Sequence, residues 1–179
     1  MILKSGDQIN DFHFNTLKGL LELLDESLKP TLRQIDDMLK EGRDPGCLCD
    51  EAEYLIGVGF CSMQQYMMSV LQDISIDAGL ARTLGAKSPK GKPIAQLMHA
   101  AGNYWKHEPE WHIWLQELPE RAQKTVDVVL HEKEYGYWPL GDLLHELSGA
   151  DDNQGVGLTN LVPYLESWRQ AVWANTDNV

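Results

Sequence analysis

The segment from Ala52 to Ile74 constrains the fold more than any other part of the sequence. Its apolar residues recur at steps of three and four, which is the spacing of one buried face of an α-helix. This pattern predicts a central helix over residues 50–76, with Met63 and Tyr66 well buried. The stripe consists of Ala52, Ile56, Gly59, Met63, Tyr66, Val70 and Ile74.

Glycines interrupt this helical pattern at Gly57 and Gly59. Glycine costs about 1 kcal/mol relative to alanine inside a helix, so its presence here needs a reason. We interpret both residues as points where a second helix approaches closely.

Helical periodicity continues along the rest of the chain, and no run shows the period-two alternation of a half-buried strand. Residues Asp77–Lys92 predict a long loop, because glycines and a proline break every period there. The sequence therefore predicts an all-α, single-domain bundle of five to seven helices over residues 1–179. Beyond the central helix, segments with helical spacing, some of them short, run from Ile9 to Pro30, Leu32 to Leu39, Pro93 to His107, Glu110 to Leu118, Glu120 to Glu132, Leu140 to Leu147 and Leu158 to Ala174.

Cysteine content and hydropathy indicate a compartment. The three cysteines form Cys47-x-Cys49 and the separate Cys61, which is a poor framework for disulfides and suits a reducing cytosol. The sequence contains no apolar run of about 18 residues, and its N-terminus lacks the apolar core of a secretory signal. We expect a cytoplasmic protein that does not enter a membrane.

Charge is distributed unevenly along this acidic chain. The net charge is −12, so the surface as a whole repels phosphates. Residues 78–107, however, contain five cations and no Asp or Glu. This basic segment either pairs with acidic helices of the same chain or binds an anion. The candidate anion-binding residues are Arg82, Lys87, Lys90, Lys92 and His99.

The helix expected at residues 94–107 has two different faces. One face is apolar, whereas the other carries imidazole, amide and ammonium groups instead of the usual Glu and Lys of a solvated face. These groups form hydrogen bonds, bind anions and ligate metals. The polar face is either an unusual solvated surface or a functional site. It consists of Gln96, His99, Asn103, Lys106 and His107.

The stretch from Ala101 to His107 resembles the Asn-x-x-Lys-His stretch of some HEPN-like helical-bundle proteins. The resemblance covers Ala52–His112, which corresponds to an expected core at about residues 50–115. HEPN domains occur in toxin, antiphage and RNA-processing systems, and their active members cleave RNA with an Arg, a polar residue and a His on one helix, often across a dimer. Asn103 and His107 match the polar and His positions, but Gly102 stands where the family has the Arg.

A chemical role can be assigned to each polar residue without the family. RNA cleavage by the 2′-hydroxyl needs a base and a cation on the phosphate. His107 has the chemistry of the base, Lys106 that of the phosphate ligand, and Asn103 can orient either group. These roles give the first hypothesis, an RNA- or nucleotide-binding module, active or degenerate, and the HEPN resemblance implies that it belongs to a toxin or phage-defence system. The alternative is a non-enzymatic interaction or structural module that docks an acidic protein partner or a second copy of itself.

Metal binding is a further interpretation of the same region. The sequence from His107 to His112 offers two imidazoles and two carboxylates, with His99 two helical turns earlier. Neither the His-x-x-x-His pair nor the Glu-x-x-His motif of bundle metal sites is present, so no metal or cofactor is assigned.

Apolar side chains after the motif predict self-association. Trp111, Trp114 and Leu115 share one face of a short helix, whereas Ile113 points elsewhere. Exposed aromatic patches usually mark an interface, and two-fold pairing is the commonest closed assembly. We therefore expect a homodimer.

Overall fold

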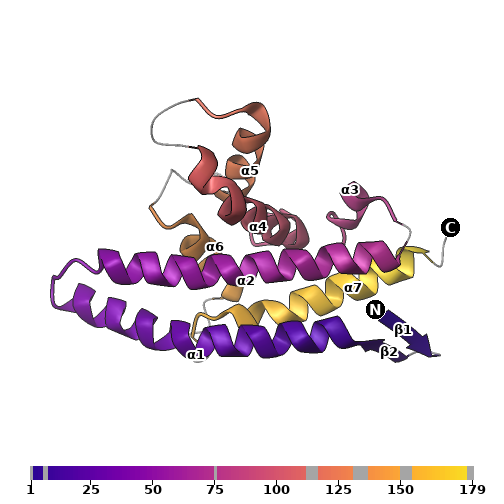
Figure 1. Cartoon of the computed structure of the whole chain (residues 1–179), viewed down its shortest axis with the longest axis horizontal. Helices are drawn as coiled ribbons and strands as arrows, with labels where there is room; N and C mark the ends of the chain where they lie inside the picture. The colour runs from indigo at the N-terminus through magenta and orange to yellow at the C-terminus, as the bar shows by residue number, and fades with distance from the viewer. Residues whose placement is uncertain are drawn as a thin grey trace.

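The computed structural model describes residues 2–5, 8–74, 76–111, 117–130, 137–149 and 155–176 (Figure 1). These residues form an all-α bundle that is preceded by a short β-hairpin, so the predicted fold class is confirmed. The elements are β1 (Ile2–Ser5), β2 (Gln8–Asp11), α1 (Phe12–Lys40), α2 (Gly46–Asp73), α3 (Ala78–Ala81), α4 (Ile94–Trp111), α5 (Glu120–Leu130), α6 (Pro139–Ser148), the 3₁₀ helix η1 (Leu158–Leu161) and α7 (Val162–Thr176).

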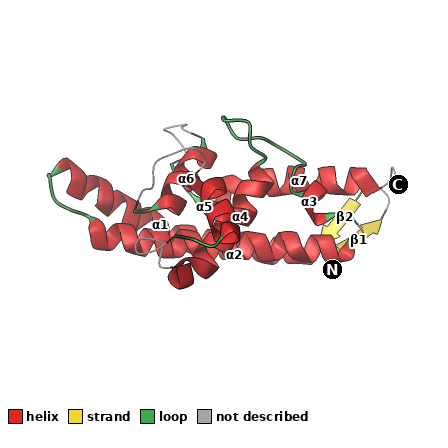
Figure 2. Cartoon of the chain, turned by 90° about the horizontal axis from the view of Figure 1, so that it is seen from above, coloured by secondary structure: helices red, strands yellow, loops and turns green. Residues whose placement is uncertain are grey.

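Helix α2 is the centre of the bundle. It packs against α1 along one side and against α4 along another, while α5 packs on α4 and α6 packs on α2 and η1. Figure 1 shows α1 and α2 as a long antiparallel pair with α7 running beside them. The hairpin lies at one end of these long helices, close to the C-terminal end of α7 (Figure 2).

The predicted seam of α2 is buried throughout. Met63 is fully buried and Tyr66 is only 4% exposed, as expected from the spacing. Gly57 and Gly59 are also sites of close approach. A methyl group on Gly57 would lie 2.2 Å from Cδ2 of Trp105, and one on Gly59 would lie 2.6 Å from Cδ2 of Leu158. Gly57 therefore accommodates α4, and Gly59 accommodates η1.

The N-terminal part of the chain differs from its prediction. Ile9, assigned to the first helix from its spacing, lies on β2, and each strand is too short to show an alternating pattern. The helix begins at Phe12, where the Asp11 carboxylate accepts a hydrogen bond from the Phe14 N–H at 3.0 Å. An N-cap of this kind fixes where a helix starts.

Two predicted helix ends at prolines are wrong. Helix α1 continues through Pro30 to Lys40, so the two predicted helices are one. Helix α4 likewise passes Pro109 and ends at Trp111. A proline inside a helix costs about 3 kcal/mol through one lost hydrogen bond and a steric clash. In α1 the burial of Leu28 and Thr31 on either side of Pro30 offsets this cost, and in α4 only two residues follow the proline.

The remaining helix predictions agree with the structure where it describes them. Helices α5 and α6 lie within two residues of their expected ends, and the last predicted helix appears as η1 followed by α7. The expected helix at Glu110–Leu118 falls largely on residues outside the described ranges. None of the described helices is long and apolar enough to cross a membrane.

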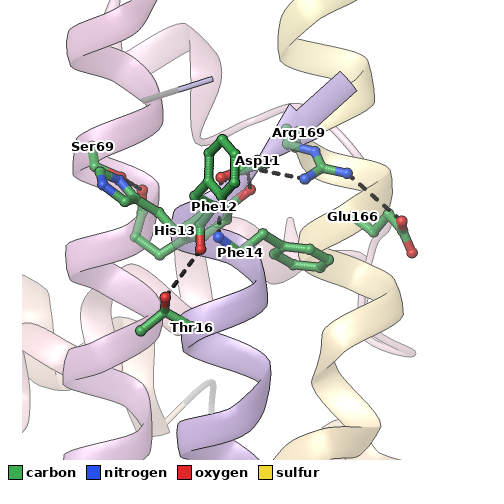
Figure 3. A network of polar contacts seen from close by, with 9 residues as sticks. Asp11, Phe12, His13, Phe14, Thr16, Ser69, Glu166 and Arg169 are labelled. Atoms are coloured by element: carbon green, nitrogen blue, oxygen red, sulfur yellow. Dashed lines mark hydrogen bonds and ion pairs between the residues drawn. The ribbon is translucent and has the colours of Figure 1, made fainter. Parts of the chain in front are cut away.

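A buried polar network joins the start of α1 to α2 and α7 (Figure 3). The Asp11 carboxylate accepts a hydrogen bond from the Tyr66 hydroxyl at 2.8 Å and another from Nη1 of Arg169 at 3.0 Å. The guanidinium of Arg169 also lies 4.6 Å from the centre of the Phe14 ring. The charges of Asp11 and Arg169 are therefore buried as a pair, in a position that fixes the two ends of the chain to each other.

A second buried carboxylate, Asp25 of α1, holds the start of η1. It is 2% exposed and accepts hydrogen bonds from the backbone N–H groups of Leu158, at 2.7 Å, and Thr159, at 3.0 Å. These donors have no partner within their own helix, so the side chain replaces the missing acceptors.

Candidate anion-binding site on helix α4

The two predicted faces of α4 are present in the structure. On the apolar face, Trp105 is partly buried against Gly57, and five residues are buried, namely Ile94, Leu97, Met98, Ala101 and Tyr104. On the polar face, His99 and Asn103 are half-buried, whereas Lys106 and His107 are exposed. The inner part of the polar face therefore borders α2 and has a fixed geometry.

Gln64 of α2 organises this inner part. Its Nε2 donates to the backbone oxygen of His99 at 3.0 Å and to Oδ1 of Asn103 at 2.7 Å. The second bond fixes the orientation of the Asn103 amide, so that Nδ2 points toward Nδ1 of His99, 3.5 Å away. A buried glutamine on α2 thus aligns two candidate residues of α4.

Arg82 lies on the other side of His99. It follows α3, and its Nη1 is 3.4 Å from Nε2 of His99. Because a guanidinium can only donate, Nε2 accepts in this contact, which puts the proton of the neutral ring on Nδ1. The Asn103 Nδ2 and the His99 Nδ1, 3.5 Å apart, are then both donors. A single ligand oxygen beside the two nitrogens could accept from both.

The electrostatic environment of His99 is positive. Burial, together with the charges of Arg82 and Lys106, lowers the pKa of His99 to about 4. His99 is consequently neutral at physiological pH, while its two charged neighbours remain cations. An anion at this position would relieve the repulsion among these groups.

Gly102 is a point of close packing between α4 and α2. A methyl group at Gly102 would lie 2.9 Å from Cβ of Gln64 and 3.0 Å from the backbone oxygen of Phe60. Position 102 is therefore packed against α2 and has no room for a long side chain. In this chain the guanidinium beside the α4 motif comes from Arg82, outside the helix.

His107 lies one helical turn beyond Asn103, at the exposed end of α4. Its Nδ1 is 3.4 Å from Oε2 of Glu110, and its ring stacks on Trp111 with centroids 6.1 Å apart. A carboxylate and an aromatic ring thus orient the imidazole, and neither of these two contacts is made by Nε2. Pairing of a His with a carboxylate is a common arrangement for a general base.

The other predicted cations are more dispersed. The backbone of Lys87 forms an isolated antiparallel β-bridge with Pro93. The Lys87 side chain is exposed, and the Lys92 side chain is partly exposed. Lys90 lies 3.5 Å from Glu146 of α6. The structure thus brings together Arg82, His99, Asn103 and Lys106. Among the predicted cations, Lys90 forms an ion pair with an acidic residue of another helix.

Sequence reasoning did not identify Gln64. Its contacts with His99 and Asn103 join positions 35 and 39 residues apart, and only the packing of α2 on α4 brings them together. A polar residue within the apolar stretch of the central helix was the available signal.

Among the described residues, no group of three or more His, Cys, Asp or Glu side chains is arranged to hold a metal ion. His112, which the metal interpretation required, lies outside the described ranges. The chain matches no protein-family model, no curated protein and no solved structure.

Proposed function

We propose that this protein binds RNA or a nucleotide through its phosphate groups, at the polar face of α4. The observation that carries the proposal is the contact of Arg82 with His99, in which a cation lies beside an imidazole already aligned by its neighbours. The proposed phosphate position lies among Arg82, His99 and Lys106, within reach of the Asn103 amide.

The charges around the proposed site support an anion as the ligand. The charged groups that shift the pKa of His99 are both cations, although the chain carries a net charge of −12. A local positive potential within a negative surface directs an anionic ligand to one position and repels it elsewhere. Guanidinium and amide donors at this position are also the groups that phosphate oxygens accept from.

His107 is the residue that we propose for any cleavage step. It lies at the exposed end of the polar face of α4. The Glu110 carboxylate beside Nδ1 stabilises the imidazolium that forms when Nε2 accepts a proton. Because the inner face binds the phosphate, RNA bound there would extend toward His107 along the helix. Binding and cleavage therefore depend on different residues and can be tested separately.

A direct experiment compares the binding of a labelled single-stranded RNA and a labelled nucleotide to three forms of the protein. Arg82→Gln removes the cation beside His99, and Arg121→Gln removes one from the exposed surface of α5. We expect Arg82→Gln to weaken binding about tenfold or more, since a charge-assisted hydrogen bond contributes about 1.5–3 kcal/mol. Arg121→Gln should bind like the unaltered protein.

Each outcome of this comparison has a clear meaning. Equal weakening by both substitutions would show that binding follows total charge and would overturn the proposed site. If RNA binds and is cleaved, His107→Ala should abolish cleavage and leave binding nearly intact. Failure of both ligands to bind would overturn the proposed function.

A second candidate function is self-association, which one surface feature favours. Tyr54 is 60% exposed and meets Trp105 edge-on at 5.1 Å, while Tyr137 is 79% exposed and lies 5.9 Å from Trp138. The indole of Trp138 donates to Asp50, one helical turn from Tyr54, so the two aromatic pairs lie on the same side of α2. Light scattering tests the dimer: a mass of 20.3 kDa that does not change with concentration would contradict it.

A further inference from the structure

A cleft beside the N-terminal half of α2 has no role in the proposed phosphate site. It has a volume of about 750 Å³ and lies among α1, α2, α6 and the residues that precede η1. This volume lies within the range of small-molecule sites. The cleft has an apolar base that is formed by Leu32, Ile35, Ala52, Ile56 and Val156.

One carboxylate is embedded in this apolar surface. Glu53 of α2 lines the cleft, and its two oxygens accept hydrogen bonds from the backbone N–H groups of Leu140 and Gly141, both at 2.8 Å. These groups begin α6, so Glu53 occupies the position at which a helix N-terminus would otherwise attract an anion. Each oxygen retains a second lone pair, so Glu53 can still accept a donor from a ligand.

The energetics of Glu53 favour a positively charged partner. Burial, together with the nearby carboxylates Asp142 and Glu108, raises its pKa to about 7 in spite of the two backbone hydrogen bonds, which lower it. A carboxylate that is costly to ionise in the free protein gains more from a cation than an exposed one does.

The remaining charges of the cleft offset one another. Helix α1 contributes two cations and one carboxylate to the cleft, namely Lys29, Arg33 and Asp36. Helix α6 contributes Asp142 and His145. All five side chains are exposed, so solvent screens them, and the two cations balance the two carboxylates. Glu53 is therefore the group that determines the charge preference of the cleft interior.

Trp138 forms a rigid aromatic wall at the same position. Its indole N–H donates to Oδ1 of Asp50 at 2.9 Å, which fixes the ring at the start of α6 beside Glu53. An aromatic face next to a carboxylate is a favourable environment for an ammonium group attached to an apolar body.

We propose that this cleft binds a small organic amine, with its apolar body on Leu32, Ile35 and Ile56 and its ammonium group donating to Glu53. Hydrogen bonds and charge fix the ammonium at the α6 end, and the apolar base of the cleft accepts the rest of the ligand. The proposal is independent of phosphate binding at α4, because the two sites share no residue.

The test uses three probes of similar size, namely 2-phenylethylamine, 2-phenylethanol and phenylacetate. Binding to the full chain is followed by NMR shifts of the Trp138 indole and of the Leu140 and Gly141 amides. We expect the amine to bind at least about tenfold more tightly than the alcohol, which corresponds to about 1.4 kcal/mol, and phenylacetate to bind least. Amine binding should also strengthen as the pH rises through about 7, because Glu53 then becomes ionised.

Two variants identify the residue responsible. Glu53→Gln removes the charge, and Glu51→Gln makes the same change on α2 outside the cleft lining. Only Glu53→Gln should remove the preference for the amine. If Glu53→Gln does not fold, Gly141→Ala provides the test, because its methyl group would lie 3.4 Å from Oε2 of Glu53 and 3.9 Å from Cδ1 of Ile56.

Gly141→Ala keeps the carboxylate and favours the helix, but narrows the cleft beside Glu53, so amine binding should weaken several-fold. Equal binding of amine and alcohol, unchanged amine binding in Gly141→Ala, or no amine binding at millimolar concentration would overturn the proposal. None of these results would bear on phosphate binding, which has separate residues and probes.

Discussion

Nη1 of Arg169 donates to Oδ2 of Asp11 over 3.0 Å, although these residues lie 158 positions apart in the chain. The pair is almost completely buried, with side-chain exposures of 7% and 2%. The hairpin, α1 and α7 meet at this point, so removal of one partner of the pair should destabilise the protein.

Arg169→Leu should lower the free energy of unfolding by about 3 kcal/mol, because it leaves the Asp11 carboxylate buried without its cation. Urea denaturation measures this loss. The control is Glu166→Gln, which removes a half-exposed carboxylate 3.6 Å from Nη2 of Arg169 and should change stability by less than about 0.5 kcal/mol. Equal losses in the two variants would contradict the assigned role.

The acid dependence of the same pair has a definite sign. Burial raises the pKa of Asp11, but hydrogen bonds from Tyr66, the Phe14 N–H and Arg169 lower it more, so the net pKa is below 3.8. A lowered pKa means that the contribution to stability is present above pH 3.8 and is lost as the pH falls through the lowered value. The difference between wild type and Arg169→Leu should therefore shrink in strong acid.

Gly57 and Gly59 of α2 give a second stability prediction. Gly57→Ala and Gly59→Ala should each destabilise the protein by about 1–3 kcal/mol, since the added methyl groups overlap Trp105 and Leu158. Gly19→Ala is the matched control, because Gly19 also lies inside a helix but has nothing within 4 Å of the added group. It should stabilise the protein by about 0.5–1 kcal/mol. Thermal denaturation distinguishes the opposite signs, and a gain at Gly57 would rule out the close approach of Trp105.

Local spacing was sufficient to predict much of this fold. The buried stripe of α2 follows directly from the steps between its apolar residues, and its glycines were correctly interpreted as close approaches. Pro30 and Pro109 were misinterpreted because a local helix-breaking signal does not include the tertiary contacts that keep a helix continuous. The start of α1 was missed because Asp11 caps it from a strand too short to recognise.

The candidate sites show the same division between local and long-range information. The polar face of α4 was visible in the sequence because His99 and Asn103 are one helical turn apart on one helix. Gln64 was not, because its contribution depends on the packing of α2 against α4. The position of Glu53 at the start of α6 depends on its hydrogen bonds with Leu140 and Gly141, which follow it by 87 and 88 positions in the chain. No sequence spacing reveals contacts over such separations.

The pH dependence of stability should reveal Glu53. Its pKa is raised from 4.5 to about 7, so its favourable contribution is fully present below pH 4.5 and is lost as the pH rises through about 7. The free energy of unfolding of Glu53→Gln relative to wild type should accordingly increase between these values, by on the order of 3 kcal/mol. Denaturation at a series of pH values measures the change, and Glu51→Gln should show no such trend. A flat difference for Glu53→Gln would contradict the burial of this carboxyl group.

His99 should show the opposite trend and a direct dependence on Arg82. Its pKa is lowered from 6.5 to about 4, first by burial and then by Arg82 and Lys106. The stability associated with neutral His99 is therefore present above pH 6.5 and is lost as the pH falls toward 4. Arg82→Gln should raise the pKa of His99, whereas Arg121→Gln should leave it unchanged, as measured by NMR titration of the imidazole. An unchanged value in Arg82→Gln would show that the two side chains are not in contact in solution.

The most direct test of phosphate binding at α4 uses the same His99 signal during titration with a nucleotide. A phosphate between Arg82 and Lys106 should offset their positive charges and raise the pKa of His99 above about 4, with weaker binding in Arg82→Gln. If the nucleotide binds and the pKa of His99 does not change, the phosphate lies elsewhere and the proposed site is wrong.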